Sequence, residues 1–217
     1  MLRDMAAPTR RRLPRAEREE KMLDAALGVF TARGFDAASM DEIAAASGIT
    51  KPMLYSYFGS KEGLYLACID RAARPMIETL RAAAVAEEDP ARRLWAGTRA
   101  YLGWVEAHRD VWARFFLEAS ARGGAPAERV EELGRELGDT LGELFGGSAR
   151  AAGVAPMGEV EAMSVCLQGA ASAIARWWLD HPEVPRDLVA LRLVNFAWRG
   201  LEELMRGNLW LPPPDTD

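Results

Sequence analysis

The chain has 217 residues, of which 49% are hydrophobic and 27% are charged, and its formal net charge is −5 at pH 7. These values allow one large domain or two small ones with a sizeable core. Cys68 and Cys166 lie far apart without a CxxC motif, so we expect buried thiols in a reducing cytoplasm. With only two histidines, no metal-ligand spacing and no nucleophile motif occurs. The sequence therefore argues against an enzyme and indicates no cofactor, no metal and no membrane span.

The charge is distributed unevenly along the chain. Residues 1–62 contain ten Lys or Arg and nine Asp or Glu, whereas the remainder contains seventeen and twenty-three. All three lysines, Lys21, Lys51 and Lys61, lie in the first part. Because phosphate contacts are local and screened by salt, a small basic patch on an acidic protein can still bind DNA.

The N-terminal segment is basic and has no apolar pattern. Arg10–Arg12 and Arg15 occur among prolines, which predicts an arm without regular structure over residues 1–15. Such an arm either reaches phosphates or the minor groove, or is a solvated tail. A first helix is expected over about residues 16–33, ending at Gly34.

A capped helix, a glycine turn and a second short helix come next. Ser39, with Glu42 three positions later, has the pattern of a capping box. Gly48 stands where this helix must end and the chain must turn, which favours a residue that tolerates positive φ. Thr50 suits an N-cap, and Pro52 fits the first turn of the following helix, where its missing N–H costs nothing.

The second short helix has one apolar and one polar, aromatic face. Leu54 and Phe58 are four residues apart and share the face that docks on the preceding helix. The other face, unusual for a buried helix, carries Lys51, Met53, Tyr55, Ser56 and Tyr57. Ser60 restarts a helix whose N-terminus, together with Lys61, offers a phosphate site. The pattern favours a helix-turn-helix DNA reader; an ordinary helical hairpin with a solvated face is the alternative.

The remainder of the chain predicts helices and no strand. They are expected over about 61–87, with a break or kink at Pro75, and over 91–107, 109–121, 127–151, 157–180 and 186–207. Loops are expected at Gly123–Pro126 and His181–Pro185. The fold class is thus all-α, with nine or ten helices. The expected divisions are an arm over 1–15, a three-helix DNA-binding domain over 16–62, a larger helical domain over 63–211 and a tail over 212–217.

Two features of the larger domain bear on function. All seven tryptophans lie after residue 90, and an aromatic cluster occupies two successive helices. Such rings are usually core, yet bulky rings can also line an apolar cavity. The helix over 157–180 carries small residues that allow another helix to approach closely, and the last helix has more apolar surface than one covering layer needs. This hairpin is either buried in a monomer or the interface of a dimer, which the pairing of DNA readers favours.

The run from Gly48 to Glu62 resembles the signature of TetR-family transcriptional regulators. The first helix resembles the family too, through the spacing of Met22, Ala25, Ala26, Phe30, Gly34 and Phe35. The close resemblance covers about residues 17–66, and beyond it only length and helical pattern agree. The sequence departs from the commonest family pattern at Met53, Ser56, Tyr57 and Gly59, which affects the operator that is read.

The resemblance implies a ligand-responsive regulator. The expected form is a repressor that binds a palindromic operator as a homodimer and is released by an apolar or aromatic small molecule. The alternative is a small-molecule-binding or adaptor protein with a non-functional helix-turn-helix. Residues expected to contact double-stranded DNA are Ser39, Thr50, Lys51, Pro52, Met53, Tyr55, Ser56, Tyr57 and Lys61. Residues expected to line the ligand pocket are Tyr101, Trp104, Trp112, Phe115, Phe116, Met163 and Trp177. Residues expected at the dimer interface are Ala170, Ala173, Ile174, Trp178, Val194 and Leu201.

Overall fold

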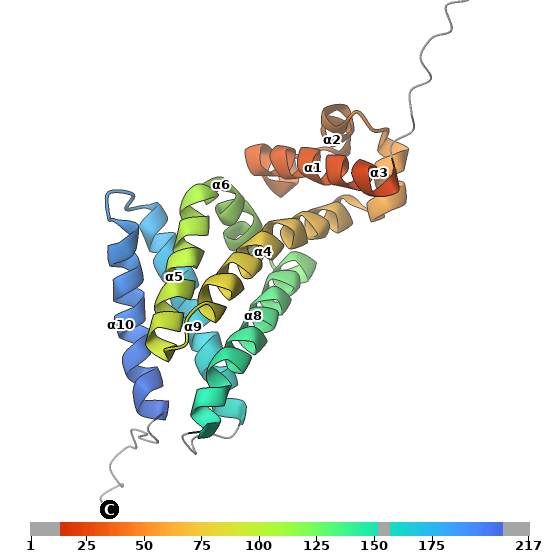
Figure 1. The fold of residues 1–217 in the computed structure, drawn as a ribbon. Coiled ribbons are helices and arrows are strands. Elements are labelled where there is room, and N and C mark those ends of the chain that lie inside the picture. The colour runs from red at the N-terminus through yellow and green to blue at the C-terminus, as the bar shows by residue number, and fades with distance from the viewer. Residues whose placement is uncertain (1–13, 152–156, 206–217) are drawn as a thin grey trace, which may run out of the picture. The chain divides into compact units, whose positions relative to one another are not determined.

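The computed structural model describes residues 14–151 and 157–205, and within these ranges it gives no side-chain placement for 140–151, 157–161, 201, 204 and 205. Its described residues form α-helices, one π-helical segment and short connections, without a strand (Figure 1). This confirms the all-α fold class. Most of the expected arm, over 1–13, and the tail over 212–217 lie outside the described residues.

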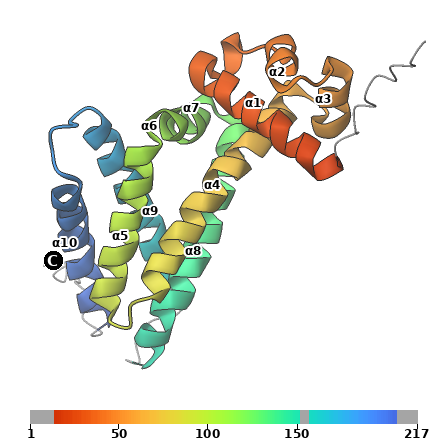
Figure 2. The same ribbon diagram turned by 45° about the horizontal axis from the view of Figure 1, so that its top comes forward.

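The chain divides into two compact units, Met1–Cys68 and Ile69–Asp217, so the division falls inside one helix. In unit 1, α1 (Arg15–Ala37), α2 (Met40–Ser47) and α3 (Lys51–Phe58) lie against one another (Figure 2). The helix that leaves unit 1 is α4 (Lys61–Val85). It continues through Pro75, which starts no new segment.

The core of unit 1 is built from all of these helices. Its members with no exposed surface are Met22, Ala26, Phe30, Ile43, Leu54, Leu64 and Cys68. The Phe30 ring meets the Tyr65 ring edge-on, with 5.0 Å between centroids. The helical backbone of α1 breaks at Gly34, where φ is 75° and ψ is 169°. The helix expected to end at this glycine therefore breaks there, and helical residues resume as far as Ala37.

The turn between α2 and α3 depends on Gly48, which has φ 67° and ψ 21°. An added Cβ at this position meets no atom within 4 Å, and the same is true of Gly28 inside α1. The two sites therefore have the same free space for a methyl group and differ in their backbone conformation. Gly48→Ala is expected to lower the free energy of unfolding by about 1–2 kcal/mol, because L-residues are strained at positive φ.

The matched control is Gly28→Ala, which is expected to raise the free energy of unfolding by about 0.5–1 kcal/mol, since alanine is favoured inside a helix. Urea unfolding followed by circular dichroism measures both changes. Equal effects of the two substitutions would contradict the left-handed assignment at Gly48.

Unit 2 contains the remaining helices. These are α5 (Pro90–Ala107), α6 (Arg109–Trp112), the π-helical segment η1 (Ala113–Leu117), α7 (Glu118–Arg122), α8 (Gly124–Ala151), α9 (Met157–Leu179) and α10 (Arg186–Met205). Within this unit α5 packs on α10, α8 packs on α9, and α9 packs on α10. Asp89 caps α5 by accepting a hydrogen bond from the Arg92 backbone N–H at 2.9 Å.

Three expectations for unit 2 need correction. The helix expected over 109–121 is interrupted by the π-helical segment, whose wider turn leaves no signal in apolar spacing. The loop expected at Gly123–Pro126 is reduced to Gly123, because α7 ends at Arg122 and α8 already begins at Gly124. Cys166, expected to be buried like Cys68, is exposed on α9.

Candidate nucleic-acid interface and effector domain

The start of α2 is fixed by a reciprocal capping box. The Glu42 backbone N–H donates to Ser39 Oγ at 3.1 Å, and the Ser39 backbone N–H donates to Glu42 Oε2 at 3.1 Å. The Ser39 hydroxyl also donates to the same carboxylate oxygen at 3.2 Å. This hydroxyl, expected to touch DNA, is thus already engaged within its own helix. Thr50 occupies the N-cap position of α3 but makes no side-chain capping bond.

Helix α3 has one buried and one exposed side. Leu54 is completely buried against the rest of unit 1. Pro52, Tyr55 and Ser56 are exposed, whereas Met53 is half-buried. A short helix that buries one leucine and leaves a polar, aromatic row open has the form of a groove-reading helix.

The two lysines of the expected interface have partners inside unit 1. Lys51 Nζ lies 2.8 Å from Asp41 Oδ2, and this hydrogen bond and charge raise the pKa of Lys51 above its ordinary value. Lys61 Nζ donates to the Asp36 carbonyl oxygen at 3.2 Å and lies 4.7 Å from the centroid of the Phe35 ring. Each of the two ammonium groups therefore already has a partner within unit 1.

The structure also places two arginines beside α3 that the sequence did not single out as a pair. Arg15 and Arg18, on the first turns of α1, lie over the Tyr57 ring, with 5.2 and 5.8 Å from guanidinium carbon to ring centroid. Together with Met53 and Ser56 these residues line a hollow of about 260 Å³, hereafter the α1–α3 hollow. Sequence spacing carried no signal for it, because α1 and α3 meet only in the fold.

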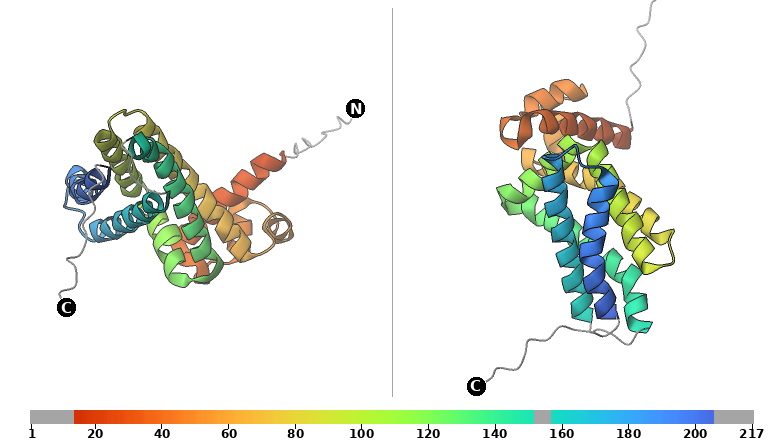
Figure 3. Two further views of the ribbon diagram at one scale, coloured as in Figure 1. Left: turned by 90° about the horizontal axis from the view of Figure 1, so that it is seen from below. Right: turned by 90° about the vertical axis from the view of Figure 1, so that its left-hand side faces the viewer.

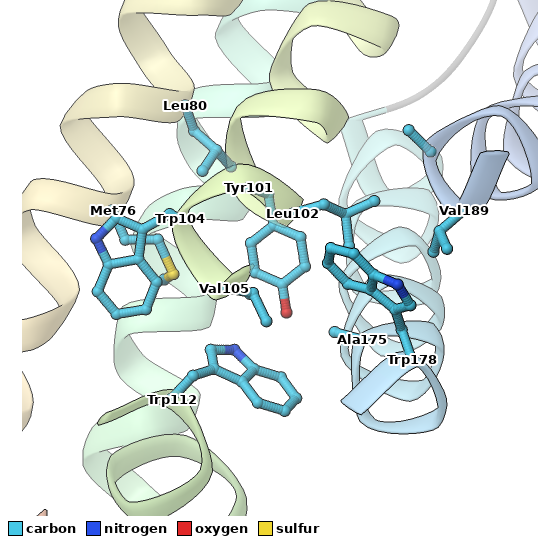
Figure 4. Close-up of a cluster of buried hydrophobic side chains, with 11 residues drawn as sticks. Met76, Leu80, Tyr101, Leu102, Trp104, Val105, Trp112, Ala175, Trp178 and Val189 are labelled. Atoms are coloured by element: carbon cyan, nitrogen blue, oxygen red, sulfur yellow. The ribbon is translucent and has the colours of Figure 1, made fainter. Parts of the chain in front are cut away.

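The core of unit 2 is aromatic and includes most of the expected pocket residues. Tyr101, Trp104 and Trp112 are buried in one cluster (Figure 4). Phe115 is also buried. The Tyr101 hydroxyl makes side-chain hydrogen bonds with Trp112 and Ser172, and burial raises its pKa above the ordinary value. The hydroxyl of Tyr101 is therefore a polar group among the apolar rings of the core.

The other three expected pocket residues differ in their positions. Phe116 is partly buried and meets Trp104 edge-on, with 6.1 Å between centroids. Met163 is half-buried, and its end lies against Gly200 of α10. Trp177 lies at the surface, where its ring stacks on His181 at 4.3 Å. The structure thus separates Trp177 from the aromatic core.

Trp178, expected at a dimer interface, is instead 1% exposed and part of the core. Its indole N–H donates to the Val184 carbonyl oxygen at 2.7 Å. Adjacent residues on a helix point about 100° apart, so the two tryptophans exchange their expected environments. This is a correction to both expectations.

Helices α9 and α10 lie side by side (Figure 3). Their exposed large apolar residues, here together called the α9–α10 face, are Val165, Trp177, Leu188, Leu191 and Phe196. Of the expected interface residues, Ala173 is exposed, whereas Ala170, Ile174 and Val194 are half-buried. The side chain of Leu201 lies outside the described residues.

In the part of the chain that the structure describes, no group of three or more His, Cys, Asp or Glu is placed to hold a metal ion. None of its helices is long and apolar enough to cross a membrane.

Comparisons with known proteins match both units. The family model described as "Bacterial regulatory proteins, tetR family" matches residues 22–68. The model described as "Tetracyclin repressor-like, C-terminal domain" matches residues 90–200. A relative from Mycolicibacterium smegmatis, named HTH-type transcriptional activator FasR, is 31% identical over 194 residues, covering 89% of this chain and 87% of its own.

Solved structures match over most of the chain as well. A TetR-like transcriptional regulator from Rhodococcus sp. RHA1 is 37% identical with a TM-score of 0.64, covering 88% of this chain and 99% of the other. FadR from Bacillus subtilis in complex with stearoyl-CoA has a TM-score of 0.67 at 15% identity, covering 87% and 98%, a likeness of fold alone. Since one family model matches half of the chain and the FasR relative spans most of it, this protein belongs to the TetR family of transcriptional regulators.

Proposed function

We propose that the protein is a ligand-responsive regulator that binds a palindromic operator as a homodimer. The observation that supports this most is α3. It buries Leu54 against α2 and leaves Tyr55 and Ser56 open, at the end of a turn fixed by Gly48. These are the parts that a helix needs to enter the major groove in a defined orientation.

The reading face is poor in hydrogen-bond donors to bases. Pro52 and Met53 have no hydrogen-bonding side-chain donor, so their expected contacts are thymine methyls and base shape. Tyr55 has a hydroxyl and is 43% exposed, which suits a phosphate contact that sets the register. We therefore propose that base discrimination per half-site is modest and that pairing of two half-sites supplies much of the specificity.

Pairing is proposed to use the α9–α10 face. A two-fold pair of these hairpins would cover Leu191 and Phe196, which are exposed in the single chain. Binding of an effector in unit 2 would change the separation of the two α3 helices. A shift of a few ångströms breaks the match to half-sites about 34–36 Å apart. Only an effector with different affinity for the two states can cause it.

The effector is proposed to be an apolar small molecule held among the aromatic side chains of unit 2. The core offers rings and the hydroxyl of Tyr101, whose partners are Trp112 and Ser172. Stearoyl-CoA is a suitable first probe, because the FadR neighbour was solved with it. Occupation is expected to release the operator, which makes the protein a repressor where the operator overlaps a promoter.

A second candidate is an activator, favoured by one observation. The FasR relative, which aligns with 89% of this chain, is named a transcriptional activator. The two candidates share DNA binding and differ in where the operator lies relative to the polymerase site. A reporter gene behind the selected operator separates them by the sign of its response.

The test of DNA binding starts from selection of duplexes bound by the full chain, followed by fluorescence anisotropy. Tyr55→Phe, which removes one hydroxyl, is expected to weaken operator binding about tenfold, as loss of a hydrogen bond to a charged phosphate predicts. Tyr55→Ala should weaken it at least as much. Added stearoyl-CoA should release the bound duplex.

Absence of any salt-dependent, sequence-selective binding would favour the adaptor alternative. Unchanged affinity of Tyr55→Ala and Lys61→Ala for the selected operator would show that the reading face is assigned wrongly. Tyr55 is exposed, so its substitution should leave the thermal unfolding of the protein unchanged.

A further inference from the structure

The α1–α3 hollow combines positive charge with missing partners. Among the residues that the structure describes, Arg18 Nη1 donates only to the Met53 sulfur, at 3.8 Å, and Arg18 Nε is buried without a hydrogen-bond partner. The guanidinium group of Arg15 lies over the Tyr57 ring. Within the part of the chain that the structure describes, neither guanidinium has a carboxylate partner. Leaving a buried donor unpaired costs free energy, so the hollow favours an incoming acceptor.

Two other cations of unit 1 have carboxylate partners. Lys51 pairs with Asp41 at 2.8 Å, and Arg33 pairs with Glu42 at 3.5 Å. An anion that approaches α3 must displace a carboxylate to gain Lys51, whereas Arg15 and Arg18 need no such exchange. The hollow, like Lys61 with its carbonyl partner, therefore offers an anion positive charge that no carboxylate of the described residues holds.

The lining of the hollow suits phosphate in particular. Guanidinium groups present parallel donors that match phosphate oxygens, and Ser56 adds an exposed hydroxyl. The Tyr57 ring lies beneath both guanidinium groups and limits their motion by cation–π attraction. Tyr57 then acts as a positioning residue, and the arginines make the contact.

We propose that the α1–α3 hollow binds a backbone phosphate of the DNA whose major groove receives α3, through Arg15 and Arg18. This inference rests on the proposed function and adds a site to it. The contact would not distinguish one base from another. It would fix the register and angle of α3, whose own side chains discriminate weakly between bases. Through this contact α1, which otherwise only supports the core of unit 1, would itself bind the DNA.

The salt dependence of operator binding tests the proposal. Each phosphate contact contributes about 0.9 to the magnitude of the slope of log K against log salt concentration. A symmetric dimer makes the contact twice, so removing it should reduce the magnitude of the slope by roughly 1.8. Anisotropy titrations of the full chain at several KCl concentrations measure this slope for Arg15→Gln, Arg18→Gln and the double variant. Arg18→Lys, which keeps the charge, should largely keep the slope.

The matched control is Arg135→Gln, which removes the same charge from an exposed position on α8 in unit 2 and should leave the slope unchanged. Circular dichroism checks that the variants fold. If Arg18→Gln unfolds unit 1, Arg15→Gln decides alone, because Arg15 is exposed. If the folded glutamine variants kept the wild-type salt slope, even with weaker binding, the hollow would not be a phosphate site. The proposed function as an operator-binding regulator would not be affected by that result. Failure of the wild type to bind any selected duplex would overturn both.

Discussion

Trp178→Ala is expected to lower the free energy of unfolding by about 3–5 kcal/mol, the range for removing a buried tryptophan. The Trp178 ring is 1% exposed, and the Arg109 guanidinium lies 5.4 Å from its centroid. Its N–H bond to the Val184 carbonyl, at 2.7 Å, ties the loop between α9 and α10 to the core. The substitution would leave both a cavity and an unpaired carbonyl. Urea unfolding at fixed protomer concentration measures the loss.

The neighbouring residue provides the control for this prediction. Trp177→Ala removes an equally large side chain, but Trp177 is 38% exposed and makes its ring contacts with His181 and Arg192 at the surface. Surface substitutions usually change stability by about 0.5 kcal/mol or less, so Trp177→Ala should destabilise the single chain far less than Trp178→Ala, apart from its effect on pairing through the α9–α10 face. Equal losses from the two alanine variants would contradict the division into a core and an exposed side of α9.

The features that the sequence predicted well are those set by neighbours in the chain. The capping box of Ser39 and Glu42 involves residues three apart, and the left-handed turn at Gly48 is a local backbone demand. The same holds for the break at Gly34 and for Pro52 in the first turn of α3. Such signals need no knowledge of the tertiary fold, which is why helix bounds and the expected DNA reader could be placed from spacing alone.

Features that depend on distant residues were missed. The pairing of Lys51 with Asp41 joins two helices across the turn, and the meeting of Arg18 with Met53 joins residues 35 positions apart. The environments of Trp177 and Trp178 were exchanged because both fit an apolar helix, and only the packing of α5 and α10 decides which one is covered. The apolar periodicity of a helix predicts which residues share a face, but it does not predict which other helix packs against that face.

The continuity of α4 bears on how the proposed regulation can operate. Residues Lys61–Cys68 of this helix belong to unit 1 and Ile69–Val85 to unit 2. Within unit 2, Asp70 pairs with Arg129 of α8 at 2.6 Å, and Arg129 also pairs with Glu132. The hydrogen bonds to Glu132 and Asp70 raise the pKa of Arg129, so its guanidinium group stays charged at any physiological pH. We therefore expect a rearrangement of α8 around the proposed effector to act on α4 through this pair.

Phe196→Asp is expected to convert the proposed homodimer to a monomer. Phe196 is 76% exposed on α10, and an aspartate there would place two like charges in a two-fold interface with no partner. Operator affinity should fall by about 10²–10⁴, because the second α3 helix no longer binds as part of the same particle. Light scattering after size exclusion measures the mass, and anisotropy measures the affinity.

The stability of each single chain should change little, since Phe196 contributes little buried surface within it. Val85→Asp is the matched control: it places the same charge at an exposed apolar residue of α4, away from the α9–α10 face, and should preserve both mass and affinity. A dimer that survives Phe196→Asp and dissociates on Val85→Asp would move the interface to another surface. If Phe196→Asp gave a monomer with unchanged operator affinity, pairing would not be the source of specificity. Base contacts by α3 would then have to carry it, against the scarcity of donors on Pro52 and Met53.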